Sequence, residues 1–259
     1  MEKPGFYEFF AGGGMVRAGL GGDWQCLFAN DISAKKAAYY QANFPGSDEL
    51  CVGDIRRIDS SSIPAGGSLA WASFPCQDLS LAGRGTGLKS ERSGTFWRFW
   101  EIVCDLNRRA KVPVVVIENV VGLLTSQKGR DFQALVQAMV DEGYLVGGLV
   151  MDAARFLPQS RPRLFVVGVR KDLPIAPALF RQGPDDIWHT NKLLEHFARF
   201  PGEVKAAWRW WDLPSPPPRS ESLSDYFEPE PQDVAWHTVA ETSKLLDAMT
   251  EVNRAKVNE

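Results

Sequence analysis

The run Val112-Pro113-Val114-Val115-Val116-Ile117 restricts the fold of this 259-residue chain more than any other stretch. Five of its six residues are valine or isoleucine. A strand of this composition is typical of a parallel sheet that helices bury on both faces. The run ends in Glu118-Asn119, and a carboxylate at the end of so apolar a strand costs free energy unless it is paired or protonated. We therefore predict an α/β protein and a functional role for Glu118.

Other apolar runs predict the remaining strands of a seven-stranded, mostly parallel sheet. They lie at residues 6–11, 24–29, 50–54, 69–73, 144–150 and 164–169, and helices are expected over 34–43, 93–109 and 131–143. Strands that alternate with helices favour one sheet with helices on both faces. Ten of the 17 prolines and five of the nine tryptophans fall after residue 173, where this alternation stops. We predict a catalytic and cofactor-binding domain over 1–172 and a Pro/Trp-rich extension over 173–259, with a final helix over 238–256.

The first three strands end in residues that suit a nucleotide-like ligand. Gly12-Gly13-Gly14 follows the first strand, Asp31 ends the second and Asp54 ends the third. A strand, a glycine turn and a helix bring backbone N–H groups close to such a ligand, and an acidic residue about 20 residues further on commonly bonds a ribose hydroxyl. Each feature alone has an ordinary alternative, which is a tight turn or a helix cap. Their succession predicts a ligand at one edge of the sheet.

The fourth strand leads to the same edge with Phe74-Pro75-Cys76-Gln77. Ligands of open α/β sheets bind beyond the carboxyl ends of the strands, which favours a reactive role for this cysteine. The alternative is a structural thiol, since free cysteine is among the most buried residue types. Arg161 and Arg163 stand two residues apart in an extended segment and point the same way, into a site or into solvent.

The composition argues against several other classes of protein. The net charge of −3 gives no global basic field, although a local basic cleft suffices for nucleic acid. The four cysteines form no CxxC pair and no zinc-spaced cluster with histidine, so we expect no metal and reduced thiols. No apolar run is long enough to span a bilayer, so we expect no membrane partner and a cytoplasmic protein.

The order of four motifs resembles that of the cytosine-5 DNA methyltransferases. The motifs are Phe10-Ala11-Gly12-Gly13-Gly14, Phe74-Pro75-Cys76-Gln77, Glu118-Asn119-Val120 and Gln159-Ser160-Arg161-Pro162-Arg163. The resemblance covers residues 5–170 and extends weakly to 256. It implies a Rossmann-like methyltransferase fold that uses S-adenosyl-L-methionine. The implied reaction is methyl transfer to C5 of a cytosine that is flipped out of double-stranded DNA.

The resemblance also implies a role for each site residue. Cys76 would add to C6 of the cytosine, Glu118 would protonate N3, and Arg163 would hold O2 while Arg161 braces the site. Among the cofactor contacts, Phe10 would pack on the adenine, Asp31 would bind the ribose and Asp54 the adenine amine. The other implied cofactor contacts are Ala11, Gly12, Gly14, Ile32, Ile55 and Pro75. Implied substrate contacts are Phe74, Gln77, Ser80, Asn119 and Gln159, with local positive charge from Arg84, Lys89 and Arg92.

The sequence departs from the family pattern in two ways. Met15 stands where the family usually has glycine and Glu8 where it often has aspartate, which we expect to affect mainly cofactor affinity. After Val252 we find neither of the family's last two motifs, which carry Arg-Gln and Gly-Asn-Ser-Val. We therefore expect a C-terminally incomplete or split enzyme that has little activity alone. A second chain would then supply the target-recognition region.

Two alternative functions stay open. One is a tRNA cytosine-5 methyltransferase of the same architecture. The other is a non-catalytic DNA-binding or regulatory subunit with this fold, against which the intact Cys76, Glu118, Arg161 and Arg163 argue. For a DNA methyltransferase, the implied location is the nucleoid of a bacterial or phage-infected cell. The enzyme would act in restriction–modification, or as a solitary or phage enzyme.

Overall fold

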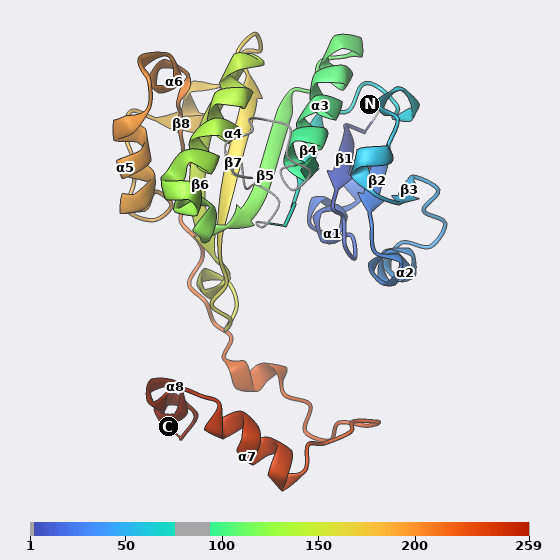
Figure 1. The fold of residues 1–259 in the computed structure, drawn as a ribbon, viewed down its shortest axis with the longest axis vertical. Coiled ribbons are helices and arrows are strands. Elements are labelled where there is room, and N and C mark those ends of the chain that lie inside the picture. Colours follow the sequence, from blue (N-terminus) through green and yellow to red (C-terminus); the bar gives the residue numbers. More distant parts are fainter. Residues whose placement is uncertain (1–2, 76–93, 259) are drawn as a thin grey trace. The chain divides into compact units, whose positions relative to one another are not determined.

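A computed structural model describes residues 3–75 and 94–258. Within these residues seven strands form one sheet in the order β3-β2-β1-β4-β5-β7-β6 (Figure 1). Every neighbouring pair from β3 to β5 is parallel, and β7 is antiparallel to both β5 and β6. The strands are β1 Gly5–Phe9, β2 Gln25–Asp31, β3 Leu50–Val52, β4 Leu69–Ala72, β5 Val114–Val120, β6 Tyr144–Asp152 and β7 Pro162–Arg170. The predicted seven-stranded, mostly parallel sheet is confirmed.

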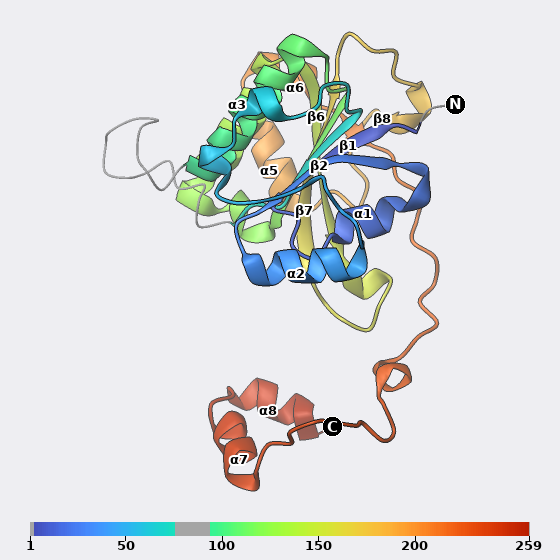
Figure 2. The ribbon, with the colours of Figure 1, turned by 90° about the vertical axis from the view of Figure 1, so that its right-hand side faces the viewer.

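Helices cover both faces of the sheet (Figure 2). On one face lie α1 Met15–Leu20 and α2 Ala34–Asn43. On the other lie α3 Gly94–Arg109, α4 Arg130–Asp141, α5 Asn191–Arg199 and α6 Gly202–Ala207. Within the described residues, every helix falls short of the length and apolar character that a membrane span needs.

Side chains of β1 alternate between two cores. Tyr7 and Phe9 are fully buried against α3, whose own apolar stripe contributes Phe96, Phe99, Ile102, Val103 and Leu106. Phe6 packs on the opposite face with Leu69 of β4 and Val116 of β5. This alternation follows from the two-residue period of a strand. It also directs Glu8, which is 1% exposed, toward the face that carries α1 and α2.

Residues after β7 pack around the edge strand β6. The short strands β8 Phe180–Arg181 and β9 Trp210–Trp211 pair with each other. The Arg209 N–H donates to the Val146 carbonyl at 2.8 Å, and Trp211 Nε1 donates to the Val167 carbonyl at 3.1 Å. A Cβ on Gly147 would overlap the Arg209 carbonyl oxygen, so only glycine allows this close approach.

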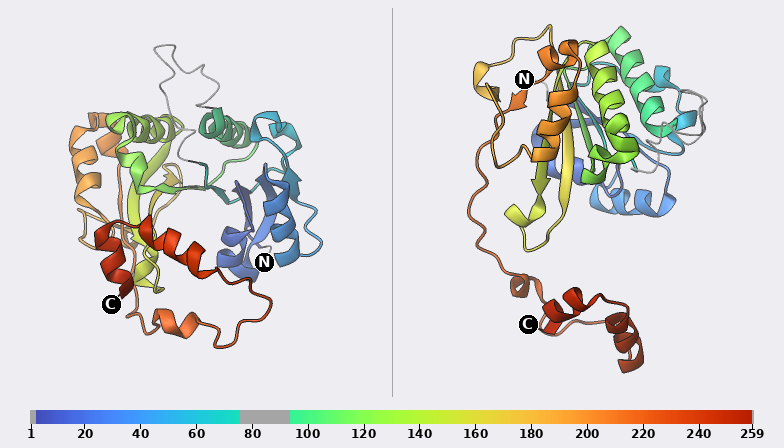
Figure 3. Two further views of the ribbon diagram at one scale, coloured as in Figure 1. Left: turned by 60° about the horizontal axis from the view of Figure 1, so that its bottom comes forward. Right: turned by 60° about the vertical axis from the view of Figure 1, so that its left-hand side comes forward.

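The chain divides into two compact units, residues 1–219 and 220–259. The second unit contains α7 Val239–Asp247 and α8 Glu251–Asn258 (Figure 3). A single helix over 238–256 was predicted, and this is wrong, because Ala248 caps α7 and Thr250 accepts a hydrogen bond from the Asn253 N–H at the start of α8. The domain boundary between residues 172 and 173 stays a prediction.

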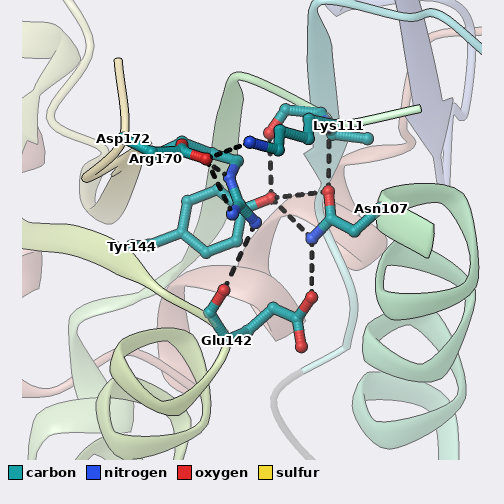
Figure 4. Close-up of polar contacts among 7 residues, drawn as sticks. Asn107, Lys111, Glu142, Tyr144, Arg170 and Asp172 are labelled. Atoms are coloured by element: carbon teal, nitrogen blue, oxygen red, sulfur yellow. Dashed lines mark hydrogen bonds and ion pairs between the residues drawn. The ribbon is translucent and has the colours of Figure 1, made fainter. Parts of the chain in front are cut away.

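A polar cluster closes the edge of the sheet at the start of β5 (Figure 4). Tyr144, which is 1% exposed, donates to the Val112 carbonyl at 2.9 Å and bonds Asn107 at the end of α3. Asn107 also donates to Glu142 at 3.0 Å. Arg170 pairs with Asp172 at 3.1 Å, and Asp172 also pairs with Lys111. Burial raises the pKa of Tyr144 to about 12, so this hydroxyl stays neutral.

Candidate active site

The glycine turn after β1 is held to the end of β2. Phe10, Gly12 and Gly14 all have positive φ, at 59°, 58° and 80°. The Gly12 N–H donates to Asp31 Oδ2 at 2.9 Å, and the other oxygen of Asp31 accepts from the Ser33 N–H at 2.8 Å. A Cβ on Gly14 would lie 2.5 Å from the ring of Phe44, so packing as well as backbone conformation requires glycine there. The structure therefore brings Asp31 to the turn.

Glu8 contacts the first turn of α1, directly after the glycine turn. Its Oε1 accepts from the Val16 N–H at 3.2 Å, in the first turn of α1. Among the described residues, its buried Oε2 has no hydrogen-bond partner. Burial raises the pKa of Glu8 to about 7. Sequence reasoning treated this residue only as a departure from the family pattern. The signal for a functional role was a carboxylate on the side of β1 opposite Tyr7 and Phe9.

The acidic residue after β3 already has a cationic partner. Asp54 accepts from the Arg56 backbone N–H at 3.0 Å and pairs with the Arg56 guanidinium at 2.6 Å. The hydrogen bond from the Arg56 side chain lowers the pKa of Asp54. Asp54 also lines a cavity of about 370 Å³ beside Phe28. Of the two isoleucines predicted nearby, Ile32 is 67% exposed, whereas the Ile55 side chain is buried at 3%.

Glu118 and Arg163 meet across β5 and β7. The antiparallel register opposes Val120 to Arg163, and Arg163 Nε lies 3.0 Å from Glu118 Oε1. Both side chains are about one-fifth exposed, at 20% and 23%. Arg161 and Gln159 are exposed in the connection between β6 and β7, where the Arg161 N–H donates to Asp152 at 2.7 Å. Arg163 is thus the arginine that the structure pairs with the predicted acid.

Asn119 fixes the end of β4. Its Nδ2 donates to the Phe74 carbonyl at 2.9 Å, and Asn119 is only 3% exposed. The Phe74 ring contacts Phe10 at 6.2 Å between centroids and is buried at 3%. Pro75 follows Phe74 directly and is exposed. The predicted residues Cys76, Gln77, Ser80, Arg84, Lys89 and Arg92 lie outside the described residues.

A pocket of about 500 Å³ lies between α1, which follows the glycine turn, and Glu118. Helix α1 contributes one wall, and the sheet contributes the other. The lining residues are Met15, Val16, Gly19, Leu20, Trp71, Ser73, Glu118 and Phe165. Glu118 therefore opens onto a mostly apolar space whose opposite wall begins directly after Gly14. Sequence reasoning did not predict Trp71 or Phe165, because their roles depend on which side of each strand faces α1.

Comparisons of sequence relate the chain to one family. The model of the family described as C-5 cytosine-specific DNA methylase matches residues 5–254. Type II methyltransferase M.BsuFI of Bacillus subtilis is 34% identical over 197 residues, which is 75% of this chain and 46% of that protein. Type II methyltransferase M.NlaX of Neisseria lactamica is 35% identical over 218 residues, covering 77% and 67% of the two chains. The chain spans about half the length of the first curated relatives it matches.

Solved structures of methyltransferases share the fold. A DNMT2 mutant of Spodoptera frugiperda superposes with a TM-score of 0.55 at 21% identity, covering 66% of this chain and 51% of that one. The methyltransferase EhMeth of Entamoeba histolytica gives 0.51 at 18% identity, covering 76% and 60%. The fold is the Rossmann-like fold of S-adenosylmethionine-dependent methyltransferases. With the family model matching nearly the whole length, the chain belongs to the C-5 cytosine-specific DNA methylase family.

Proposed function

We propose that this chain is the catalytic part of a DNA cytosine-5 methyltransferase. It would transfer a methyl group from S-adenosyl-L-methionine to C5 of a cytosine in double-stranded DNA. The observation that carries the proposal is Glu118, which lies 3.0 Å from the Arg163 guanidinium and lines the pocket that α1 borders. The family description supports DNA as the substrate, and relatives named Type II methyltransferases support a restriction–modification setting.

The residues at the ends of β1, β2 and β3 fit the cofactor by their chemistry. Among the described residues, a Cβ on Gly12 would meet no atom within 4 Å, so this part of the structure leaves space beside the turn. Each oxygen of Asp31 accepts one backbone N–H, and a carboxylate oxygen can accept a second bond from a ribose hydroxyl. When bound, S-adenosyl-L-methionine supplies an electrophilic methyl group. We assign the adenine ring to Phe10, its amine to Asp54, and further contacts to Ala11, Gly12, Gly14, Ile32, Ile55 and Pro75.

The chemistry at the base rests on one thiol and one carboxyl group. Cytosine C5 is a poor nucleophile, and addition of the Cys76 thiolate to C6 forms an S–C6 bond and makes C5 nucleophilic. Glu118, once it has taken up a proton, delivers that proton to N3 as negative charge develops there. After methylation, a base such as water takes the C5 proton, the S–C6 bond breaks to release the Cys76 thiolate, and the N3 proton returns to Glu118. The base must first leave the duplex to reach these groups.

Other side chains hold these groups in place. Arg163 orients the Glu118 carboxyl through its ion pair and would bind O2 of the base, while Arg161 braces the site. Asn119 holds the Phe74 carbonyl and thereby the backbone that leads to Cys76. Contacts to the base and its flanking backbone are assigned to Phe74, Gln77, Ser80, Asn119 and Gln159.

Covalent trapping on duplex DNA that contains 5-fluorocytosine tests the proposal. The fluorine blocks the last elimination, so the wild-type chain should form a stable adduct when S-adenosyl-L-methionine is present. Cys76→Ala should form none, and Cys104→Ala, which removes a different thiol, should react like wild type. Glu118→Gln should slow adduct formation by about 10²- to 10⁴-fold, the contribution typical of a general acid.

The reaction needs two further arms. The chain spans about half the length of its relatives, so the trapping reaction is carried out with and without the product of the adjacent reading frame. The predicted second chain has no support from the relatives and stays a prediction. Transfer RNA replaces the duplex in the other arm. An adduct with tRNA alone would identify an RNA enzyme, and no adduct with either nucleic acid would favour the non-catalytic alternative.

A further inference from the structure

A small cavity with basic side chains lies beyond the carboxyl end of β5. Its volume is about 230 Å³. Its lining residues, which we call the basic pocket, are Leu124, Thr125, Lys128, Lys192, His196 and Arg199. The 3₁₀ turn Val121–Leu124, which follows β5 directly, and the loop at residues 125–129 form one side, and α5 forms the other. The pocket therefore lies at the same edge of the sheet as Glu118, close in sequence to that strand end.

His196 holds the two sides together. Its Nε2 lies 2.6 Å from the Leu124 carbonyl, an acceptor, so the ring nitrogen is the donor. A Cβ on Gly129 would lie 2.5 Å from the His196 ring, so glycine allows the ring to approach the start of α4. The ring also packs edge-on against Phe132 at 4.9 Å. The position of α5 against this loop is thus fixed by buried contacts rather than by its charges.

The cations converge from both sides of the pocket. Lys192, His196 and Arg199 are spaced i, i+4 and i+7 on α5 and therefore share one face of that helix. Lys128 comes from the opposite side. There Gln127 and Lys128 have positive φ, at 47° and 61°, a backbone conformation that non-glycine residues seldom adopt.

The charges in the pocket are not balanced. Lys192 pairs with Glu195 at 2.7 Å, and the buried Asp131 accepts from Ser126. Within residues 3–75 and 94–258, neither Lys128 nor Arg199 takes part in an ion pair. Burial lowers the pKa of His196, and the charges of Lys192 and Arg199 lower it further. The histidine is therefore neutral near pH 7, and the pocket keeps a net positive charge that an anion would neutralise.

We propose that the basic pocket binds a backbone phosphate of the duplex while Glu118 engages the flipped base. The proposal rests on the proposed function, because it takes DNA as the substrate. Phosphate contacts fix the register and orientation of a protein on DNA without reading its sequence. Such a contact suits a chain whose net charge is −3, since it offers DNA a local positive site rather than a global field.

Salt dependence of binding separates this contact from others. The variant K128Q/K192Q/R199Q removes three positive charges from the basic pocket. The matched control R108Q/K111Q/K171Q removes three from the opposite edge of the sheet. Binding of a fluorescent duplex is measured by anisotropy between 50 and 200 mM salt, with circular dichroism to check folding. Each phosphate contact contributes about −0.9 to the slope of log K against log salt. We expect the slope of the pocket variant to be less negative by about 1 to 3 and its affinity to fall roughly tenfold or more. The control should keep the slope and the affinity of wild type.

The outcomes separate this proposal from the function on which it rests. A wild-type chain that binds no duplex, both alone and with the product of the adjacent reading frame, overturns both. A wild-type chain that binds duplex, with an unchanged slope in the pocket variant or an equal loss in the control, overturns only the pocket. The single variant K128Q, at an exposed side chain, repeats the test without risk to folding. Two further results would contradict a DNA phosphate site. One is a pocket variant that loses tRNA binding but keeps duplex binding. The other is inorganic phosphate at millimolar concentration that occupies the pocket without displacing the duplex.

Discussion

Glu8 is a buried carboxyl group with few compensating partners. Backbone N–H groups at the start of α1 and the charge of Arg17 lower its pKa, yet burial outweighs them and raises it to about 7. Burial also raises the pKa of the neighbouring Cys26 thiol to about 11, so that group brings no charge. Arg17 is shared with Glu49 and Tyr40. Ionised Glu8 is therefore costly in the folded state.

The first prediction concerns the pH dependence of stability. Because the folded pKa of Glu8 is raised above its ordinary value of 4.5, the folded chain holds this proton more tightly than the unfolded chain. Its contribution is fully present below about pH 4.5 and is lost as pH rises through 7, with a limit on the order of 3 kcal/mol. The free energy of unfolding, measured by urea at pH 5 and pH 8, should fall more for wild type than for Glu8→Gln. Titration of His189 and His196 is common to both chains and cancels. Parallel pH profiles would contradict this role.

Single residues at strand ends could be predicted, but their partners could not. Glu118 follows an apolar run and Asp31 ends another, so the ends of these runs indicated their edge of the sheet. The pairing of Glu118 with Arg163 depends on the antiparallel register of β5 and β7, two strands far apart in the sequence. Arg161 and Arg163 read alike in the sequence, and only the start of β7 at Pro162 separates an exposed side chain from a paired one. The roles of Cys76 and of the other site residues stay predictions.

At the scale of elements, helices with strong local signals were predicted well. Residues 34–43 form α2 as expected, because Ser33 caps it and apolar residues recur at helical spacing. The packing of residues 173–219 could not be predicted from its prolines and tryptophans. It depends on the glycines Gly147 and Gly148 of β6, which let other chain segments approach, as Gly148 does for Leu193 and Trp208. Such contacts join segments with no shared local pattern.

The second prediction tests this packing at Gly147. Alanine there would place a methyl group against the Arg209 carbonyl and the Trp211 indole. Both residues also donate to the sheet, through the Arg209 N–H and Trp211 Nε1. Overpacking of this kind costs about 1–3 kcal/mol, and loss of the attached segment adds to it. Urea unfolding should show Gly147→Ala destabilised by at least about 2 kcal/mol. Gly183→Ala is the control, because a Cβ there meets no atom of the described residues within 4 Å, and it should stay within about 0.5 kcal/mol. Equal midpoints for the two variants would refute the argument.

Across the whole molecule, the two ends of the sheet differ in chemistry. The carboxyl end of the parallel strands carries the glycine turn, Asp31, Glu118 and the basic pocket. The opposite end carries the polar cluster around Tyr144, whose hydrogen bonds and ion pairs satisfy one another (Figure 4). Functional groups thus gather where the strands end, as in other open α/β sheets. The second unit has a different character, since large apolar side chains such as Trp236 and Val239 are 74% and 84% exposed.

The last prediction is that the sheet does not depend on residues 220–259 for its stability. That unit buries little apolar surface, and burial is the main source of folding free energy. A chain ending at Arg219 should unfold in urea within about 1 kcal/mol of the full chain. Tryptophan fluorescence can follow this unfolding, because eight of the nine tryptophans precede residue 220.

A chain ending at Ala207 is the matched control. It loses the buried Trp208, Trp210 and Trp211, which pack against α4, α5 and β7, and should fail to fold cooperatively. A loss above about 2 kcal/mol in the longer chain would show instead that the second unit stabilises the first.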